Sequence, residues 1–388
     1  MLPHLVRIFE AASALGAAAS LGYYGLCLCG AVSFLKARPS QSTSSDFCPP
    51  VSILKPLKGA DPELYECLRS HCLLNYSGYE IIFGVSEAGD SAAAVVERLR
   101  NEFPRVSMQL VVCGENLGAN TKVSNLAQMV RAARHDYLVV SDSDIRVGPD
   151  YLRRVIRPLA EDKTGMVTCL YRGKCAPTLG SRLESLGIST DFCPGVLAAR
   201  LIEGGIRFGL GSTLAFRRRD LQRAGGFEPL ADYLADDYEL GRRIAALGLR
   251  VELSEEAVET VLPVYSLPEF LSHQLRWART IRGARPAGYL GLVFTFGLVW
   301  AVLALIFAQG ATWAWILLGT AAALRLAVAT VVGKTILADQ RLPAMLYLLP
   351  LRDLLGAGIW LAGFAGRRVV WRGETFTLQN GKLQRGRG

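Results

Sequence analysis

The chain has 388 residues, 51% of them hydrophobic, and a formal net charge of +9. This length allows one large domain with additional segments, or two domains. Its nine cysteines form no Cys-x-x-Cys pair, so the sequence indicates neither a zinc site nor a disulfide framework, and a reducing, cytosolic environment is expected. No nucleic-acid recognition motif accompanies the basic residues, so a nucleic-acid partner is not expected.

Residues 1–37 are predicted to form an N-terminal transmembrane anchor. Residues 11–35 contain no charged side chain, and such a stretch is long enough to cross a bilayer as a helix. A cleaved signal peptide is the alternative, but the apolar stretch is too long and the Ala-Arg-Pro sequence after it is a poor cleavage context. Residues 38–50, rich in Pro, Ser and Thr, are predicted to be a linker.

Residues 51–265 have the pattern of a soluble domain in which strands alternate with helices. Strands are predicted at 51–59, with a break at Pro56, and at 79–85, 106–113 and 135–140, and helices at 62–74, 92–103 and 122–134. This alternation predicts an α/β fold with a mostly parallel central sheet and helices on both faces. Beyond residue 150 the pattern is looser, but a helix is predicted from Leu234, and Gly248 ends it.

Acidic side chains follow two of the predicted strands. Asp142 and Asp144, spaced i and i+2, come directly after the strand at 135–140, and Asp90 follows the strand at 79–85. Ligands of parallel sheets bind beyond the carboxyl ends of the strands, and carboxylates suit hard divalent cations. For an isolated Asp-x-Asp pair a surface turn is the alternative, so the assignment depends on the rest of the chain.

Residues 266–287 are predicted to be an interfacial amphipathic helix. Arg276, Arg279, Arg282 and Arg285 recur every third residue around Trp277. Directly before an apolar stretch, such a cationic stripe is typical of a helix that lies at a membrane surface. A solvated charged face is the alternative.

Residues 288–365 are predicted to be a C-terminal membrane region. Spans are expected near 288–308 and 311–332, because no charged residue occurs from 286 to 324. The third apolar segment, 343–365, carries Arg352 and Asp353 at its centre, where charge is costly. We therefore expect this segment to be re-entrant or to lie on the membrane surface.

The last residues, 366–388, form a basic tail with six Lys and Arg residues against Glu374 alone, a net charge of +5. Basic residues that flank membrane segments favour the cytoplasmic side. The tail and the domain at 51–265 are therefore expected on the cytoplasmic side of the inner (cytoplasmic) membrane. Anionic lipid headgroups are the expected partners of the basic residues.

Six sequence motifs together resemble those of family-2-type glycosyltransferases with the GT-A fold. The motifs lie at residues 52–59, 118–125, 141–147, 224–227, 235–240 and 273–277, in the family's order. They are similar to those of the ceramide glucosyltransferases and, more closely, of the hopanoid-biosynthesis glycosyltransferases. The resemblance implies an inverting transfer of glucose or N-acetylglucosamine from a UDP-sugar to a hydroxyl of a membrane lipid, such as a hopanoid polyol or ceramide.

The resemblance also implies roles for individual residues. Asp144 would bind Mg²⁺ or Mn²⁺, which neutralises the leaving diphosphate, and Asp237 would be the base that takes the proton of the acceptor hydroxyl. Donor-binding roles fall to Pro56, Asp90, Lys122 and Asp142, and acceptor or leaving-group roles to His273, Arg276 and Trp277.

Simpler explanations exist for three of the charged residues. Lys122 fits a solvated lysine at a helix start, and Asp236 and Asp237 fit acidic residues that only complement a helix dipole. Of these two, Asp236 is expected to cap its helix.

Two positions depart from the family pattern. His273 occupies the place where the family has Gln or Arg, and Gln274 comes one residue later. Glu87 stands where relatives often have Asp, so Asp90 is expected to take over that role.

Two other function classes are alternatives to lipid glycosylation. A processive polysaccharide synthase shares the nucleotide-sugar motifs but needs more membrane spans to form a channel. A non-catalytic, membrane-anchored protein that binds a nucleotide sugar or a lipid would be expected to carry degenerate acidic motifs, whereas every acidic motif is present here.

Overall fold

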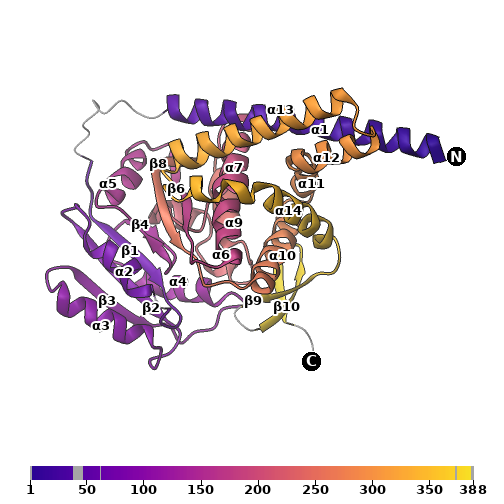
Figure 1. The fold of residues 1–388 in the computed structure, drawn as a ribbon. Helices are drawn as coiled ribbons and strands as arrows, with labels where there is room; N and C mark the ends of the chain where they lie inside the picture. The colour runs from indigo at the N-terminus through magenta and orange to yellow at the C-terminus, as the bar shows by residue number, and fades with distance from the viewer. Residues whose placement is uncertain (1, 38–46, 62, 372–373, 386–388) are drawn as a thin grey trace. The chain divides into compact units, whose positions relative to one another are not determined.

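The computed structural model describes residues 2–37, 47–61, 63–371 and 374–385 (Figure 1). Most of the predicted linker, and Arg372 and Arg387 of the predicted tail, lie outside these residues. The chain forms two compact units. The helical unit comprises Met1–Arg38, Cys175–Gly204 and Leu262–Asn380, and the sheet unit comprises Pro39–Lys174, Gly205–Val261 and Gly381–Gly388.

The sheet unit is built on an eight-stranded sheet with the order β3-β2-β1-β4-β7-β6-β8-β5. Its strands are β1 (Val51–Pro56), β2 (Tyr79–Val85), β3 (Ser107–Val112), β4 (Tyr137–Val140), β5 (Ile145–Arg146), β6 (Thr164–Lys174), β7 (Leu214–Arg217) and β8 (Arg250–Val261). Its helices are α2 (Leu64–Cys72), α3 (Ala92–Glu102), α4 (Thr121–Ala132), α5 (Tyr151–Ile156), α8 (Arg218–Arg223) and α9 (Asp236–Ala246), with short turns η1 (Arg157–Ala160) and η3 (Glu228–Leu230) and the short strand β11 (Lys382–Arg385).

The first half of this sheet is parallel. β1 pairs in parallel with β2 and β4, and β2 pairs in parallel with β3, whereas β7 runs antiparallel to both β4 and β6. β1 and β2 are buried along nearly their whole length, as strands covered by helices on both faces must be. The predicted α/β fold with a mostly parallel sheet is confirmed, and β2 begins and ends at the predicted residues.

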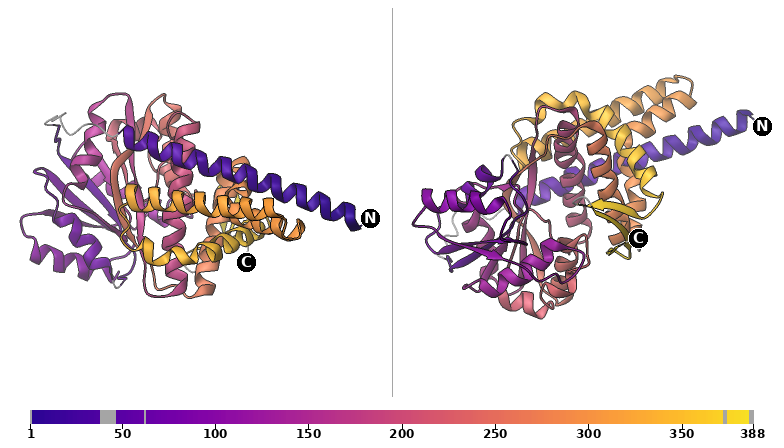
Figure 2. Two further views of the ribbon diagram at one scale, coloured as in Figure 1. Left: turned by 45° about the horizontal axis from the view of Figure 1, so that its top comes forward. Right: turned by 90° about the horizontal axis from the view of Figure 1, so that it is seen from below.

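The helical unit contains the apolar segments. Its elements are α1 (Leu2–Lys36), α6 (Leu179–Gly187), the π-helical η2 (Ile188–Phe192), α7 (Cys193–Ile202), α10 (Leu267–Ala284), α11 (Pro286–Gly291), η4 (Leu292–Thr295), α12 (Gly297–Phe307), α13 (Thr312–Val328), the π-helical η5 (Ala329–Ile336), η6 (Leu342–Leu348), α14 (Leu349–Gly363), β9 (Arg368–Trp371) and β10 (Glu374–Gln379). Helix α1 packs against α7, α12 and α13, and Figures 1 and 2 show it running beside α13. A Cβ on Gly30 of α1 would lie 2.5 Å from the carbonyl oxygen of Leu197 in α7, so only glycine permits this approach.

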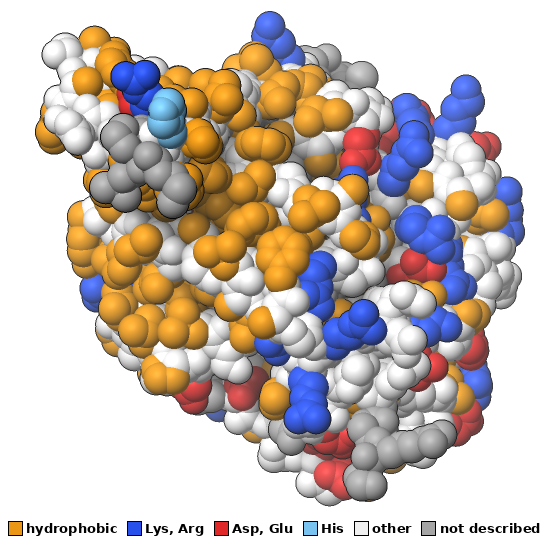
Figure 3. Space-filling model, turned by 90° about the vertical axis from the view of Figure 1, so that its right-hand side faces the viewer, with side chains coloured by type: hydrophobic (Ala, Val, Ile, Leu, Met, Phe, Trp, Pro, Cys, Tyr) orange, Lys and Arg blue, Asp and Glu red, His pale blue; other side chains and the backbone are white. Residues whose placement is uncertain are grey.

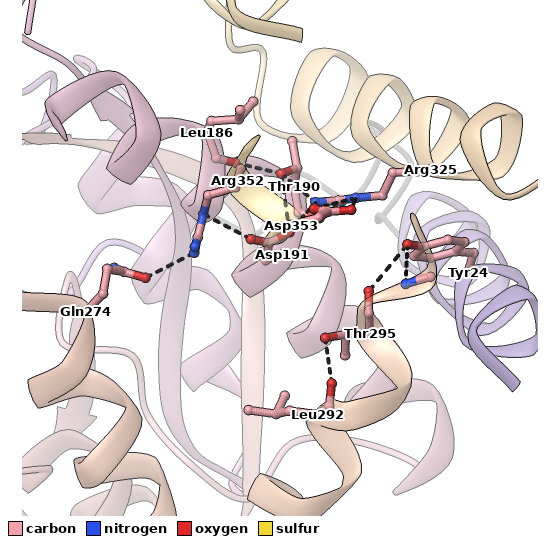
Figure 4. A network of polar contacts seen from close by, with 11 residues as sticks. Tyr24, Leu186, Thr190, Asp191, Gln274, Leu292, Thr295, Arg325, Arg352 and Asp353 are labelled. Carbon is pink, nitrogen blue, oxygen red and sulfur yellow. Dashed lines mark hydrogen bonds and ion pairs between the residues drawn. The ribbon is translucent and has the colours of Figure 1, made fainter. Parts of the chain in front are cut away.

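Three helical segments of the described chain are long and apolar enough to cross a membrane: His4–Lys36, Thr312–Ile336 and Leu342–Gly363. One continuous span is predicted near 288–308, but the structure has two helices there. Pro286–Thr295 and Gly297–Phe307 are separated by a bend of 55°. Tyr24 of α1 supports the break: its hydroxyl accepts from the Gly297 N–H (3.2 Å) and donates to the Thr295 carbonyl (3.3 Å) (Figure 4). These bonds satisfy backbone groups that an unbroken helix would satisfy internally.

The charges at the centre of the third apolar segment are not left unpaired. Asp353 accepts hydrogen bonds from Arg325 of α13, and Arg352 lies beside Asp191 of η2. Both side chains are buried, so neither charge is exposed to lipid at these positions. The re-entrant or surface-lying arrangement of this segment stays a prediction.

The helices of this unit expose many large apolar side chains, among them Ile8, Phe9, Trp315, Ile316 and Leu361. Figure 3 shows hydrophobic side chains gathered over a broad area of the face it draws. Exposed apolar areas of this kind are typical of surfaces that contact a membrane or another protein.

Candidate active site

The predicted donor-site residues gather at one edge of the sheet, where the parallel strands end. Ser141 continues from β4 and donates its N–H to the carbonyl of Leu54 in β1 (3.2 Å). The two carboxylates that follow, Asp142 and Asp144, therefore lie at the carboxyl ends of β1 and β4. This edge is where ligands of α/β sheets bind.

Lys122, at the start of α4, links two of the acidic motifs. Its Nζ lies 2.7 Å from Asp142 Oδ1 and 3.5 Å from Asp236 Oδ2, and its side chain is only 12% exposed. Burial lowers the pKa of Lys122, but attraction to Asp142 and Asp236 outweighs it and raises the pKa above the usual value. Lys122 is therefore a buried counter-ion, and the alternative of a solvated lysine is wrong.

The expectation that Asp236 caps its helix is wrong. The N-cap residue of α9 is Ala235, and Asp236 is the first residue inside the helix. The Asp236 side chain is buried and accepts from the Asn120 side-chain amide (3.3 Å). Burial raises its pKa, although attraction to Lys122 opposes this. Asp236 thus joins α9 to α4, because Asn120 is also the N-cap of α4.

Asp237 borders the same small space as Asp142. A Cβ on Gly211 would lie 3.2 Å from Asp142 Oδ2 and 3.3 Å from Asp237 Oδ2, so the two carboxylates border one position at which a side chain would be crowded. Asp237 Oδ1 accepts from the Tyr238 N–H (2.8 Å). Burial, and then repulsion by Asp236, raise the pKa of Asp237 to about 7.

Asp144 is open to solvent on one side and held by hydrogen bonds on the other. Its Oδ2 accepts from the Thr260 hydroxyl (2.8 Å), and its carbonyl accepts from the Val261 N–H (2.9 Å), which fixes it to the end of β8. Lost hydration, followed by repulsion from Asp142, raises its pKa.

The residues around Asp144 fit a metal ion only if substrate phosphates supply most of its ligands. Among the described residues, no three His, Cys, Asp or Glu side chains are grouped closely enough to hold an ion. One or two carboxylates with substrate phosphates completing the shell is, however, the usual arrangement for Mg²⁺. Asp144, an exposed residue, suits that arrangement.

Asp90 and Pro56 lie at the same edge but have local partners. Asp90 accepts from the Gly59 N–H (2.9 and 3.2 Å) and from the Ala92 N–H (2.9 Å). It therefore fixes the turn after β1, in which Gly59 has a φ of +71°, to the start of α3. Pro56 is buried as the last residue of β1.

Lys55 has a place in the site that its position in the sequence motif did not suggest. Its side chain is fully buried, and its Nζ donates to the Asp142 carbonyl (2.6 Å) and the Ser141 hydroxyl (3.2 Å). Burial lowers the pKa of Lys55 to about 8. His71, also fully buried, lies 3.4 Å from the same hydroxyl. The available signal was a lysine inside an otherwise apolar buried strand.

The predicted acceptor-end residues, His273, Arg276 and Trp277, lie on α10 of the helical unit. Trp277 donates its indole N–H to His273 Nε2 (3.2 Å), and the Tyr265 ring lies 5.3 Å from the His273 ring. Within the described chain the Arg276 guanidinium has no hydrogen bond or ion pair, and burial lowers its pKa.

The other arginines of the predicted cationic stripe have partners within the helical unit. Arg279 donates to the carbonyl of Ala365 (2.8 Å), and Arg282 donates to those of Phe364 and Gly366 (2.7 Å each), at the end of α14. Arg285 pairs with Glu203 (2.6 Å). These three arginines therefore have partners within the helical unit, and the interfacial position of this helix stays a prediction.

Comparison with known proteins agrees with the sequence motifs. The profile of Glycosyl transferase family 21 matches residues 13–384. Ceramide glucosyltransferase 3 of Caenorhabditis elegans is 29% identical over 251 residues, which cover 64% of this chain and 54% of that protein. Ceramide glucosyltransferase 1 of the same organism is 26% identical over 232 residues, covering 60% and 49%. The chain thus spans about half the length of the curated relatives it matches.

A solved structure shares the fold. The mannosyltransferase PcManGT from Pyrobaculum calidifontis, in complex with GDP-Man and Mn²⁺, matches 92% of this chain and 99% of its own, with a TM-score of 0.56 at 18% identity. At this identity the likeness shows the fold alone, and it confirms the GT-A architecture expected from the motifs.

Proposed function

Because the chain belongs to glycosyl transferase family 21, we propose that it is an inverting glycosyltransferase. It moves glucose or N-acetylglucosamine from a UDP-sugar to a hydroxyl of a membrane lipid, such as ceramide or a hopanoid polyol. The observation that carries this proposal is the position of Gly211, against which the Asp142 and Asp237 carboxylates both lie. A donor-binding carboxylate and a base candidate thereby border one space.

The donor would bind at the edge of the sheet. Lys122 and Lys55 supply positive charge beside Asp142, and Asp144 is exposed. A Mg²⁺ or Mn²⁺ ion held by Asp144 and the diphosphate would stabilise the negative charge of the leaving group. Asp90 holds the turn after β1, and we assign the nucleoside to the neighbourhood of Asp90 and Pro56.

Asp237 is the proposed base. Inversion needs one group that removes the proton of the acceptor hydroxyl as its oxygen attacks the anomeric carbon. A carboxyl with a pKa of about 7 is well suited to that task, since it is substantially ionised near neutral pH yet a stronger base than an ordinary aspartate. The Tyr238 N–H holds one oxygen, which leaves Oδ2 directed toward the space beside Gly211.

The acceptor end is assigned to α10. Arg276 is half-buried and forms no ion pair within the described residues, although Glu184 and Tyr265 attract it. This arrangement suits a cation that meets the leaving diphosphate. His273 and Trp277 are joined by a hydrogen bond, so histidine here orients the indole as well as occupying the family's Gln or Arg position.

A lipid acceptor agrees with the helical unit. Three of its segments are long and apolar enough to cross a membrane, and an acceptor that stays in the bilayer would reach an enzyme anchored there. We place the sheet unit on the cytoplasmic side of the inner membrane because basic residues flank the apolar segments.

A processive polysaccharide synthase is the second candidate, and a product ladder on a gel would favour it. The decisive experiment expresses the full chain in cells that contain both UDP-glucose and UDP-N-acetylglucosamine and identifies new glycolipids by mass spectrometry. We expect a single sugar on one lipid class. The purified protein with labelled donor and extracted lipids must reproduce that product, and an absence of any glycosylated lipid contradicts the proposal.

A further inference from the structure

The helical unit contains four buried or partly buried charged side chains in one network (Figure 4). Arg325 donates to Asp353 (2.7 Å) and to Asp191, and Arg352 Nε lies 3.2 Å from Asp191 Oδ2. Two cations therefore face two carboxylates. Charges placed among apolar helices are costly and mark functional positions in many membrane proteins.

Asp191 is the open member of this network. Its side chain is 36% exposed, whereas those of Arg325, Asp353 and Arg352 are 3%, 4% and 9% exposed. It lies in the π-helical turn η2, a rare conformation that frequently occurs at functional sites. A carboxylate has about four acceptor positions, so Asp191 can accept further hydrogen bonds while the two arginines hold it.

Hydrogen bonds connect Asp191 to the acceptor motif. Arg352 Nη2 donates to the Gln274 side-chain oxygen (3.0 Å), and the Gln274 amide donates to Glu184 Oε2 (2.7 Å). That same oxygen lies 3.4 Å from His273 Nδ1. Gln274, one place later than the family pattern expects, is thus the link between α10 and the buried charges.

An aromatic contact also connects η2, which contains Asp191, to the acceptor motif on α10. Phe192, the residue after Asp191, packs edge-on against Trp277, with ring centroids 6.2 Å apart. Trp277 is 36% exposed. An open carboxylate and an open aromatic surface are therefore neighbours.

The buried members of this region already face each other. Arg352 Nε lies beside Asp191, and His273 Nδ1 lies beside Glu184. The open acceptor position is therefore that of Asp191, whose side chain is 36% exposed. The matching ligand is a hydrogen-bond donor, such as a hydroxyl or a secondary amide N–H.

We propose that Asp191 binds the non-reacting polar groups of the acceptor lipid. A hydroxyl or amide N–H of the headgroup donates to Asp191, and Phe192 and Trp277 contact the adjoining apolar part. This inference rests on the proposed lipid glycosylation. It selects lipids with a second hydrogen-bonding group over lipids with one hydroxyl.

The test compares two acceptors with the full-length protein in mixed micelles containing UDP-sugar and Mn²⁺. One acceptor is the lipid identified as the substrate, and the other is a long-chain primary alcohol with a single hydroxyl. In the wild-type protein we expect kcat/KM to favour the first lipid strongly. In Asp191→Asn we expect this preference to fall about 10- to 100-fold, the worth of a hydrogen bond to a charged group.

Asp339→Asn is the matched control, because Asp339 is another buried carboxylate of the helical unit and accepts from Ser189 rather than from Arg352. It should leave the preference unchanged. If Asp191→Asn fails to fold, the wild-type protein is assayed with a substrate analogue whose non-reacting hydroxyl or amide N–H is methylated, and the same loss is expected.

The outcomes separate this inference from the proposed function. An unchanged preference in folded Asp191→Asn, or full activity with the methylated analogue, overturns the role of Asp191 while lipid glycosylation stands. If the wild-type protein glycosylates no lipid at all, the proposed function fails, and the inference fails with it.

Discussion

The charged groups at the sheet edge and those inside the helical unit are organised in opposite ways. In the helical unit two arginines face two carboxylates, and three of the four side chains are less than a tenth exposed. At the sheet edge two lysines lie among four carboxylates, those of Asp142, Asp144, Asp236 and Asp237.

The difference indicates which region awaits a ligand. A balanced, closed network needs nothing further, so it can hold helices together. Burial, followed by repulsion from neighbouring carboxylates, raises the pKa values of Asp144 and Asp237. The excess of carboxylates also attracts a divalent cation. Only Asp191 departs from this division, since it belongs to the balanced network and is nevertheless open.

The largest effect is expected from Asp237→Asn. An amide cannot take a proton from the acceptor, so turnover should fall by about 1,000-fold or more. Binding of the UDP-sugar, measured by isothermal titration with Mn²⁺, should persist because Lys122 and Asp142 are untouched. Unchanged turnover would remove the base assignment, and a loss of donor binding would instead place Asp237 in the donor site.

Removing a charge from the network of Arg325, Asp353, Asp191 and Arg352 should lower the stability of the protein. Asp353→Asn leaves Arg325 buried beside one carboxylate instead of two, and breaking a buried pair typically costs about 3–5 kcal/mol. We expect a lower Tm in detergent, with a partial return in the double variant Arg325→Met, Asp353→Leu. The exposed pair Arg219 and Asp162 is the control, and its loss should leave Tm unchanged. A wild-type Tm for Asp353→Asn would mean that the network does not hold the helices.

Transfer should depend on a divalent ion held by the carboxylates at the sheet edge. Removing divalent ions with EDTA should stop transfer, and Asp144→Asn should lower kcat on the order of 100-fold at ordinary Mn²⁺ concentrations. Part of this loss should be recovered at high Mn²⁺. Glu97→Gln, which changes an exposed carboxyl on α3 of the same unit, is the control. Full activity in EDTA would take the metal away from Asp144.

Local patterns predicted the sheet and its acidic edge well. Buried apolar runs identified β2 to the residue, and the positions after the strands identified Asp142 and Asp144. The contacts that decide the roles of these residues could not be predicted from local sequence patterns, because they join segments that are distant in the chain. Lys122 meets Asp236, and Gly211 lies against Asp237, pairings that only the folded chain creates.

The membrane region was harder to predict for a related reason. Arg352 and Asp353 are costly in an apolar segment taken by itself, but in the folded chain Asp191 and Arg325 are their partners. The bend before Gly297 is likewise supported by Tyr24, which lies 273 residues away in sequence. Hydropathy finds apolar segments, but tertiary partners decide where charge and irregular backbone are tolerated.

The smallest expected effect is the pH dependence of transfer. Asp237 acts as a carboxylate, and burial raises its pKa to about 7. The value of kcat/KM for the acceptor should therefore be level above about pH 8 and fall about tenfold for each pH unit below 7, because protonation removes the base. Repulsion from Asp236 contributes to the raised pKa, so Asp236→Asn should shift this fall toward lower pH. A fall centred near pH 4 in the wild-type protein would mean that Asp237 has an ordinary carboxyl pKa, and the contrast between an overcharged sheet edge and a balanced helical network would then lose its electrostatic basis.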